Sequence, residues 1–171
     1  MIRETFPVGL LQCNCTVMGD EASGAATVVD PGAEIARILA VLNRHQLFLM
    51  QIIVTHAHID HIAGALALKE ATGAPILYSQ ADLPLVAIME AQAGWIGTAT
   101  PEVKPPDHSP EDLEMLTFGE TNAQILHTPG HTEGSLCVYL PEENLLLAGD
   151  TLFAGSVGRT DLPGGQRYAH R

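Results

Sequence analysis

The sequence predicts an α/β domain in which strands and helices are arranged in layers. Three observations support this fold class. Short apolar stretches of strand length alternate with longer stretches in which apolar residues recur at helical spacing. Clusters of Gly, Pro, Asn and Asp separate the two kinds of stretch. Histidine and aspartate directly follow several apolar stretches, as expected for functional loops at the ends of strands in a layered fold.

The composition is that of a folded chain, with 171 residues, 46% hydrophobic and 16% charged. We expect a single domain spanning residues 1–171. The apolar stretches are too short to cross a membrane, and residues 1–7 lack the apolar core of a signal peptide. The net charge of −12 disfavours nucleic acid, because binding phosphates requires Lys and Arg. We therefore expect a cytoplasmic protein without a membrane or nucleic-acid partner; no oligomeric state is predicted.

The first half of the chain alternates between the two kinds of element. Two strands are predicted at residues 14–18 and 27–30, and the turn residues between them indicate a hairpin. Helical spacing of apolar residues then predicts an amphipathic helix over 33–45. A short buried strand over 51–54 follows, and then a helix over about 62–72 that ends at a glycine.

The second half continues the alternation. A helix is expected over 81–93, with Pro84 tolerated only in its first turn. The segment 94–110 is rich in Gly, Pro and Thr and is expected to be a surface loop. From Gly149 onward the glycine content predicts a loop-like tail. Further strands are predicted at residues 76–78, 123–127, 136–140 and 145–148.

Three cysteines fit a reducing compartment better than a disulfide framework. Cys13 and Cys15 are two residues apart in a predicted strand, so both thiols point to one face, which we expect to be the core. Cys137 lies within an apolar run and is also expected to be buried.

The densest group of metal-binding side chains is the sequence His-Ala-His-Ile-Asp-His. It places His56, His58, Asp60 and His61 within six residues, directly after the predicted strand 51–54. Imidazole and carboxylate are the ligands of borderline first-row metals, above all zinc. Because no simple structural need explains these side chains so close together, the motif predicts a metal site.

Two later loops offer further ligands. His131 lies in a Pro-Gly-His-Thr loop after the strand 123–127, and Asp150 lies in a Gly-Asp loop after the strand 145–148. A neighbouring glycine lets the backbone turn sharply or approach a metal closely. Strand ends in a layered sheet meet at one edge, so we expect these two side chains to join the first motif.

These motifs, together with the segment Gly-Arg-Thr-Asp-Leu-Pro-Gly-Gly at residues 158–165, resemble the metallo-β-lactamase superfamily. Within it they are similar to the glyoxalase II-like branch, that is, to small bacterial hydroxyacylglutathione hydrolase-like enzymes. The similarity runs from about Phe6 to Gly165, nearly the whole chain. The resemblance implies an αββα sandwich, with the metal site at one edge between the two sheets.

The resemblance also implies a ligand set and an activity. His56, His58 and His131 would hold a first metal, Asp60 and His61 a second, and Asp150 would bridge the two. The implied metals are two zinc ions, although sites of this type also accept iron and manganese. The implied reaction is hydrolysis of a small-molecule thioester, such as S-lactoylglutathione, by a metal-bound hydroxide.

Three residues receive further candidate roles. Asp60 is the candidate catalytic residue within the ligand set. Arg159 is a candidate for steadying an anionic substrate, with a structural salt bridge as the alternative. Asp30 follows a strand and precedes Pro-Gly, and it is a candidate to support a ligand histidine.

The sequence departs from the family pattern in one respect. The second metal of the family takes another histidine from a Pro-Gly-His loop downstream of the bridging aspartate, and residues 151–171 hold no such loop. His170 does not match it. By this comparison the domain is expected to be C-terminally incomplete, with the last strand and helix missing.

The departure leaves two alternative functions open. A mononuclear site formed by His56, His131 and Asp150 would suit non-haem iron, as in the persulfide dioxygenases of the superfamily. An inactive metal-binding fragment is the alternative from a different class.

Overall fold

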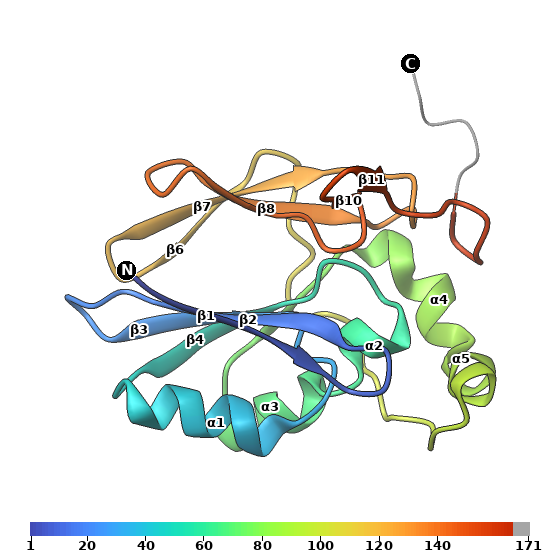
Figure 1. Ribbon diagram of the computed structural model, residues 1–171, viewed down its shortest axis with the longest axis horizontal. Helices are drawn as coiled ribbons and strands as arrows, with labels where there is room; N and C mark the ends of the chain where they lie inside the picture. Colours follow the sequence, from blue (N-terminus) through green and yellow to red (C-terminus); the bar gives the residue numbers. More distant parts are fainter. Residues whose placement is uncertain (166–171) are drawn as a thin grey trace.

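The structure is a computed structural model that describes residues 1–165. Two β-sheets lie face to face (Figure 1). Helices α1 (Ile35–Arg44) and α3 (Ala65–Thr72) lie along the outer side of the larger sheet, and α4 (Leu83–Ala87) and α5 (Met89–Ile96) lie at one end of the sandwich. The predicted α/β sandwich is confirmed.

The larger sheet has five strands in the order β1-β2-β3-β4-β5. The pairs β1–β2 and β2–β3 are antiparallel, and β3–β4 and β4–β5 are parallel. Parallel pairing brings the carboxyl ends of β3 and β4 to the same edge. The strands are β1 (Ile2–Val8), β2 (Cys13–Gly19), β3 (Ala25–Val29), β4 (Phe48–Ile53) and β5 (Ile76–Leu77).

The smaller sheet has four antiparallel strands in the order β6-β7-β8-β9. Strands β7 and β9 therefore run in the same direction, and their carboxyl ends also share one edge. The strands are β6 (Met115–Phe118), β7 (Thr121–His127), β8 (Leu136–Leu140) and β9 (Leu145–Leu147). A separate hairpin consists of β10 (Leu152–Phe153) and β11 (Ser156–Val157).

Three predicted features need correction. The chain opens with β1, an edge strand that the sequence analysis missed because exposed Arg3 and Pro7 interrupt its apolar pattern. Strand β6 was also missed, since its four residues are too few to show a clear alternation and its exposed Met115 is apolar. The tail after Gly149 is not entirely loop-like, because it contains the short β10–β11 hairpin.

The helix predicted over 62–72 is two helices, α2 (Ile59–Ile62) and α3. Gly64 lies at the junction, and a Cβ there would come within 2.3 Å of the Pro31 carbonyl oxygen. The chain therefore bends where it packs closely against another loop. The helix predicted over 81–93 is likewise interrupted, with α4 and α5 meeting at Ile88 after a short 3₁₀ turn (Gln80–Asp82).

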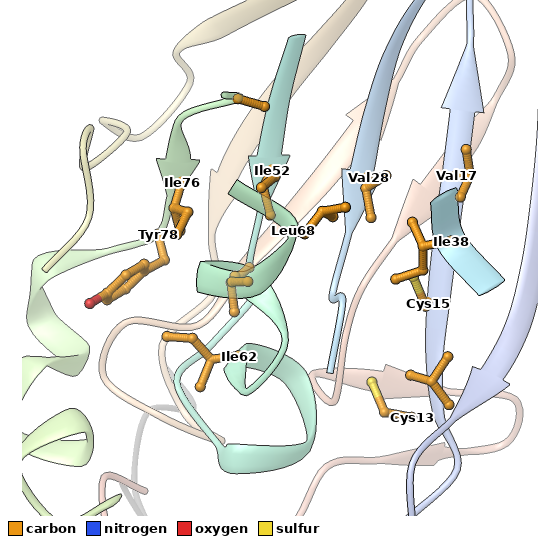
Figure 2. Close-up of a cluster of buried hydrophobic side chains, with 14 of the residues drawn as sticks. Cys13, Cys15, Val17, Val28, Ile38, Ile52, Ile62, Leu68, Ile76 and Tyr78 are labelled. Carbon is orange, nitrogen blue, oxygen red and sulfur yellow. The ribbon is translucent and has the colours of Figure 1, made fainter. Parts of the chain in front are cut away.

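Two hydrophobic cores follow from the alternation along the strands. On β2, Cys13, Cys15 and Val17 face the helices, whereas Met18 faces the second sheet. Figure 2 shows the two cysteines in the core between the larger sheet and the helices, with Ile38 of α1 beside them. All three cysteines are buried and free, as predicted. None of the described helices is long and apolar enough to span a membrane.

Polar contacts join the two sheets at both ends. Near the histidine motif, the backbone N–H of Leu136 in β8 donates to the carbonyl of Thr55, at 2.9 Å. At the opposite end, the Asp20 carboxylate accepts the backbone N–H of Glu120 at 3.1 Å and also binds Ser23. The loops that follow β4 and precede β8 are therefore held against each other.

Candidate metal centre

Three imidazoles from two loops converge at one edge of the sandwich. His56 and His58 follow β4, and His131 lies in the loop between β7 and β8. The Nε2 atom of His131 lies 3.0 Å from Nδ1 of His58 and 3.2 Å from Nε2 of His56. All three side chains are buried. The structure thus brings together the three residues predicted to hold a first metal.

The spacing of these nitrogens fits a metal ion. In a tetrahedral zinc site with bonds of 2.0–2.1 Å, ligand atoms lie about 3.3–3.4 Å apart, close to the two distances above. Three imidazoles are also the protein ligands of some catalytic zinc sites.

A second group of ligand atoms adjoins the first. Nε2 of His61 lies 3.5 Å from a carboxylate oxygen of Asp60 and 3.4 Å from Oδ1 of Asp150. The other oxygen of Asp150, Oδ2, lies 3.7 Å from Nε2 of His131. Asp150 therefore points one oxygen at each group, which is the geometry of a bridging carboxylate.

A buried chain of hydrogen bonds orients His56. The hydroxyl of Thr55 donates to Oδ2 of Asp30 at 2.8 Å, so its oxygen is free to accept from Nδ1 of His56 at 3.1 Å. Asp30 also accepts the backbone N–H of Thr55 at 2.7 Å. With its proton on Nδ1, His56 presents the lone pair of Nε2 to the metal position.

Backbone carbonyls of residues 158–165, here called the strap, orient the other two imidazoles. Nδ1 of His131 donates to the carbonyl of Arg159 at 2.7 Å. The ring of His58 hydrogen-bonds the backbone of Pro163, which has only a carbonyl to offer. Gly158 begins the strap, and a Cβ there would lie 1.7 Å from the carbonyl oxygen of Asp150. The strap can therefore lie against the site only with glycine at this position.

His61 is supported from its other side. Its Nδ1 lies 3.0 Å from Oδ2 of Asp30 and 3.4 Å from the thiol sulfur of Cys13. The structure thus places Asp30 beside a candidate ligand histidine, as the sequence suggested. The buried carboxylate of Asp30 therefore supports both ligand groups. It contacts His61 directly, and it is linked to His56 through the Thr55 hydroxyl.

The electrostatics also suit a cation. Burial lowers the pKa of His56 well below its ordinary value and that of His58 to about 4, so both are neutral, as metal ligands must be. Burial alone would lower the pKa of His61, but the carboxylates of Asp30 and Asp150 outweigh it and raise the pKa well above the ordinary value. The same carboxylates would attract a metal ion.

Asp82 joins the two histidine loops and was missed by the sequence analysis. Its carboxylate is buried and accepts three hydrogen bonds, each from 2.7 to 2.9 Å. The donors are the N–H of Ala57 between the first two histidines, the hydroxyl of Thr132 and the N–H of Gly134. A lone aspartate before Leu-Pro gives no sequence signal for this role, because its partners lie 25 and about 50 residues away.

Gln92 of α5 also stabilises the loop that carries His56 and His58. Its Oε1 accepts the N–H of Ile59 at 2.9 Å, and its Nε2 donates to the carbonyl of Leu85 at 2.9 Å. The side chain is buried. It ties the start of α2 to the end helices, so the direction of the histidine motif depends on α5 as well as on β4.

Two further polar side chains, those of Arg159 and His127, point away from the candidate ligands. The side chain of Arg159 is 62% exposed, and its guanidinium binds the Asp161 carboxylate through two nitrogens, at 2.7 and 2.9 Å. His127 points to the carbonyl of Pro110, at 3.0 Å. A substrate role for Arg159 stays a prediction. His170 lies outside the described residues.

Comparison with known proteins agrees with this geometry. A model of the Metallo-beta-lactamase superfamily matches residues 8–171. A hydroxyacylglutathione hydrolase of Haemophilus influenzae is 35% identical over 164 residues, which cover 95% of this chain and 77% of that protein.

Two solved structures have similar folds. The B3 metallo-beta-lactamase BLEG-1 matches with a TM-score of 0.87 and 32% identity, covering 96% of this chain and 79% of that one. The protein TTHA1623, solved in a di-iron-bound form, matches with a TM-score of 0.83 and 36% identity, covering 95% of this chain and 79% of that one. Fold, site geometry and sequence agree, and the chain belongs to the metallo-beta-lactamase superfamily.

Proposed function

We propose that this chain is a metal-dependent hydrolase that cleaves a thioester of a small molecule. The observation that carries the proposal is the carboxylate of Asp150, which points one oxygen toward His61 and the other toward His131. Two ligand groups that share a carboxylate suit two metal ions about 3.5–4 Å apart. The similarity to a hydroxyacylglutathione hydrolase at 35% identity supports a thioester as the substrate.

The ligand atoms divide unequally between the two positions. The first has three imidazole nitrogens and one oxygen of Asp150. Within residues 1–165, the second has His61, Asp60 and the other oxygen of Asp150. We propose zinc for both, with iron as the alternative that the di-iron-bound relative supports. The first position should bind its ion more tightly.

The residues of the chain have separate tasks in the reaction. When bound, the ions would lower the pKa of a water to about 7 and polarise the substrate carbonyl. Asp150 would hold the two positions at a fixed separation, and the partly exposed Asp60 side chain, 3.5 Å from Nε2 of His61, would complete the second position. The water would release one proton to solvent as it ionises, and its oxygen would form a bond to the carbonyl carbon. The carbon–sulfur bond would then break to give a carboxylic acid, which loses its remaining proton to solvent. The thiolate leaves without a proton from the protein, since thiols are acidic enough not to need one.

The test is an assay of metal-loaded protein on S-lactoylglutathione and on the neutral thioester S-acetyl-N-acetylcysteamine, with the released thiol measured. Thiol release should depend on the metal and stop with a chelator. His131→Ala should abolish it because the first position loses an imidazole. His108→Ala, at an exposed histidine paired with Glu114, is the matched control and should keep full activity.

The same preparation separates the alternatives. One bound iron together with oxygen uptake on glutathione persulfide, and no thioester cleavage, would replace the hydrolase with a persulfide dioxygenase. Bound metal without turnover of any of these substrates would show an inactive metal-binding module.

A further inference from the structure

An apolar groove lies beside the candidate metal centre, and the proposed reaction gives it no role. Its cavity is about 170 Å³, and Asp60 of the centre is one of its lining residues. We call it the Leu10 groove. Apart from Asp60, its main walls are the apolar side chains of Leu10, Leu11, Ala33, Ile59, Ile96 and Pro101.

Two leucines of the groove are exposed on a turn that two hydrogen bonds stabilise. Leu10 is 72% exposed and Leu11 53%, in the turn between β1 and β2. The side chain of Gln12 closes this turn by donating to the carbonyl of Gly9 at 2.8 Å, and Glu34 accepts the N–H of Gly9 at 3.2 Å. Adjacent exposed leucines on a fixed turn indicate a surface that contacts an apolar partner.

The position of this turn relates the two exposed leucines to the candidate metal centre. Figure 1 shows the β1–β2 turn at the same end of the molecule as α2, which carries Asp60, and as α4 and α5. The opposite wall comes from the end of α5 and the segment after it, through Ile96 and Pro101. A molecule in the groove would therefore contact Asp60 as well as the two leucines and the end of α5.

We propose that the Leu10 groove receives the apolar acyl chain of a thioester whose carbonyl lies at the metal centre. This rests on the proposed hydrolase function and adds the class of acyl group. A second cavity of about 310 Å³ borders His61 and Asp150, and its wall is mixed: leucines and Phe153 line it together with polar residues and Asp30. In the Leu10 groove, by contrast, Asp60 is the one charged residue of the lining. An uncharged alkyl chain is complementary to the Leu10 groove, because an anionic chain would be desolvated there and repelled by the negative charge of Asp60.

The test is the dependence of kcat/KM on acyl length, measured on metal-loaded protein with N-acetylcysteamine thioesters. The acyl groups are acetyl, butanoyl, hexanoyl and a six-carbon chain ending in a carboxylate. Each methylene that enters the groove should raise kcat/KM about fourfold. The acidic six-carbon chain should be at least tenfold worse than hexanoyl.

Two variants test whether the groove causes this dependence. In Leu10→Asn/Leu11→Asn the gain per methylene should fall below twofold, and both positions are exposed enough for the protein to fold. Leu113→Asn makes the same change at a leucine that is 59% exposed in the loop before β6, and it should keep the fourfold gain.

The outcomes separate this proposal from the one it rests on. Thioester cleavage with no gain per methylene, or with a gain that the double variant retains, overturns the groove proposal and leaves the hydrolase intact. Equal or better cleavage of the acidic chain also overturns it. If metal-loaded protein cleaves none of the thioesters, the hydrolase proposal fails and the groove proposal fails with it.

Discussion

At the scale of single residues, the centre depends on side chains that do not bind metal themselves. Thr55 is the clearest case, because one hydroxyl links the Asp30 carboxylate to Nδ1 of His56. Partners that fix the tautomer and direction of a ligand histidine commonly contribute 10- to 100-fold to metal affinity.

Thr55→Val should therefore weaken metal binding by about 10- to 100-fold, since the valine keeps the shape but not the hydroxyl. Competition with a chromophoric chelator measures this affinity. Thr55→Ser restores the hydroxyl and should bind metal almost as tightly as the wild type. Equal affinity in the valine variant would show that the Thr55 hydroxyl does not orient His56.

Asp82 is the second residue whose substitution should have a large effect, in this case on the free energy of unfolding. Asp82→Asn puts an amide N–H₂ among three donors, leaving at least one of them without an acceptor in a buried site. A loss of about 2–3 kcal/mol in unfolding free energy is expected, measured by denaturant titration. Asp112→Asn is the control: this exposed residue accepts one backbone N–H, from His127, and its change should cost less than 1 kcal/mol. Similar small losses in both variants would contradict the role of Asp82.

At the scale of elements, the strap fixes the first metal position through its backbone. It supplies carbonyls to His131 and His58, and it reaches them only because Gly158 packs against the Asp150 carbonyl. Both Asp150 and two of the candidate ligand imidazoles therefore depend on one segment without regular secondary structure.

Gly158→Ala should displace the strap, because its Cβ would lie 1.7 Å from the Asp150 carbonyl oxygen. Metal affinity at the first position should fall more than tenfold, by competition titration. The control is Gly94→Ala within α5, where a Cβ has open space. That change should leave metal binding unaltered and stabilise the helix by up to about 1 kcal/mol. A Gly158→Ala protein with unchanged affinity would show that the strap is not needed.

Elements with a strong periodic pattern were predictable from the sequence. Strand β8 has the predicted bounds, and the predicted helix over 33–45 corresponds to α1. The edge strands β1 and β6 were not predictable, since polar residues and Pro7 interrupt β1 and β6 has only four residues. The break at Gly64 depends on contact with a distant loop. The candidate ligands were visible because they cluster in short motifs. Their supports were not, because Asp82 and Gln92 act over long sequence separations.

At the scale of the whole molecule, metal binding should contribute to folding stability. The centre concentrates buried imidazoles and carboxylates, and two divalent ions would offset a third of the net charge of −12. A ligand that binds only the folded state adds about 2.7 kcal/mol at a concentration 100 times its Kd. Removing metal with a chelator should lower Tm by several degrees, and adding zinc should restore it. An unchanged Tm would contradict this coupling.

The most direct test of the centre is a calorimetric titration of metal-free protein with zinc. The structure predicts two binding events, with the tighter one at the three imidazoles. His131→Ala should remove the tighter event, and His61→Ala should remove only the weaker one. A titration with one event that survives His131→Ala would contradict the account.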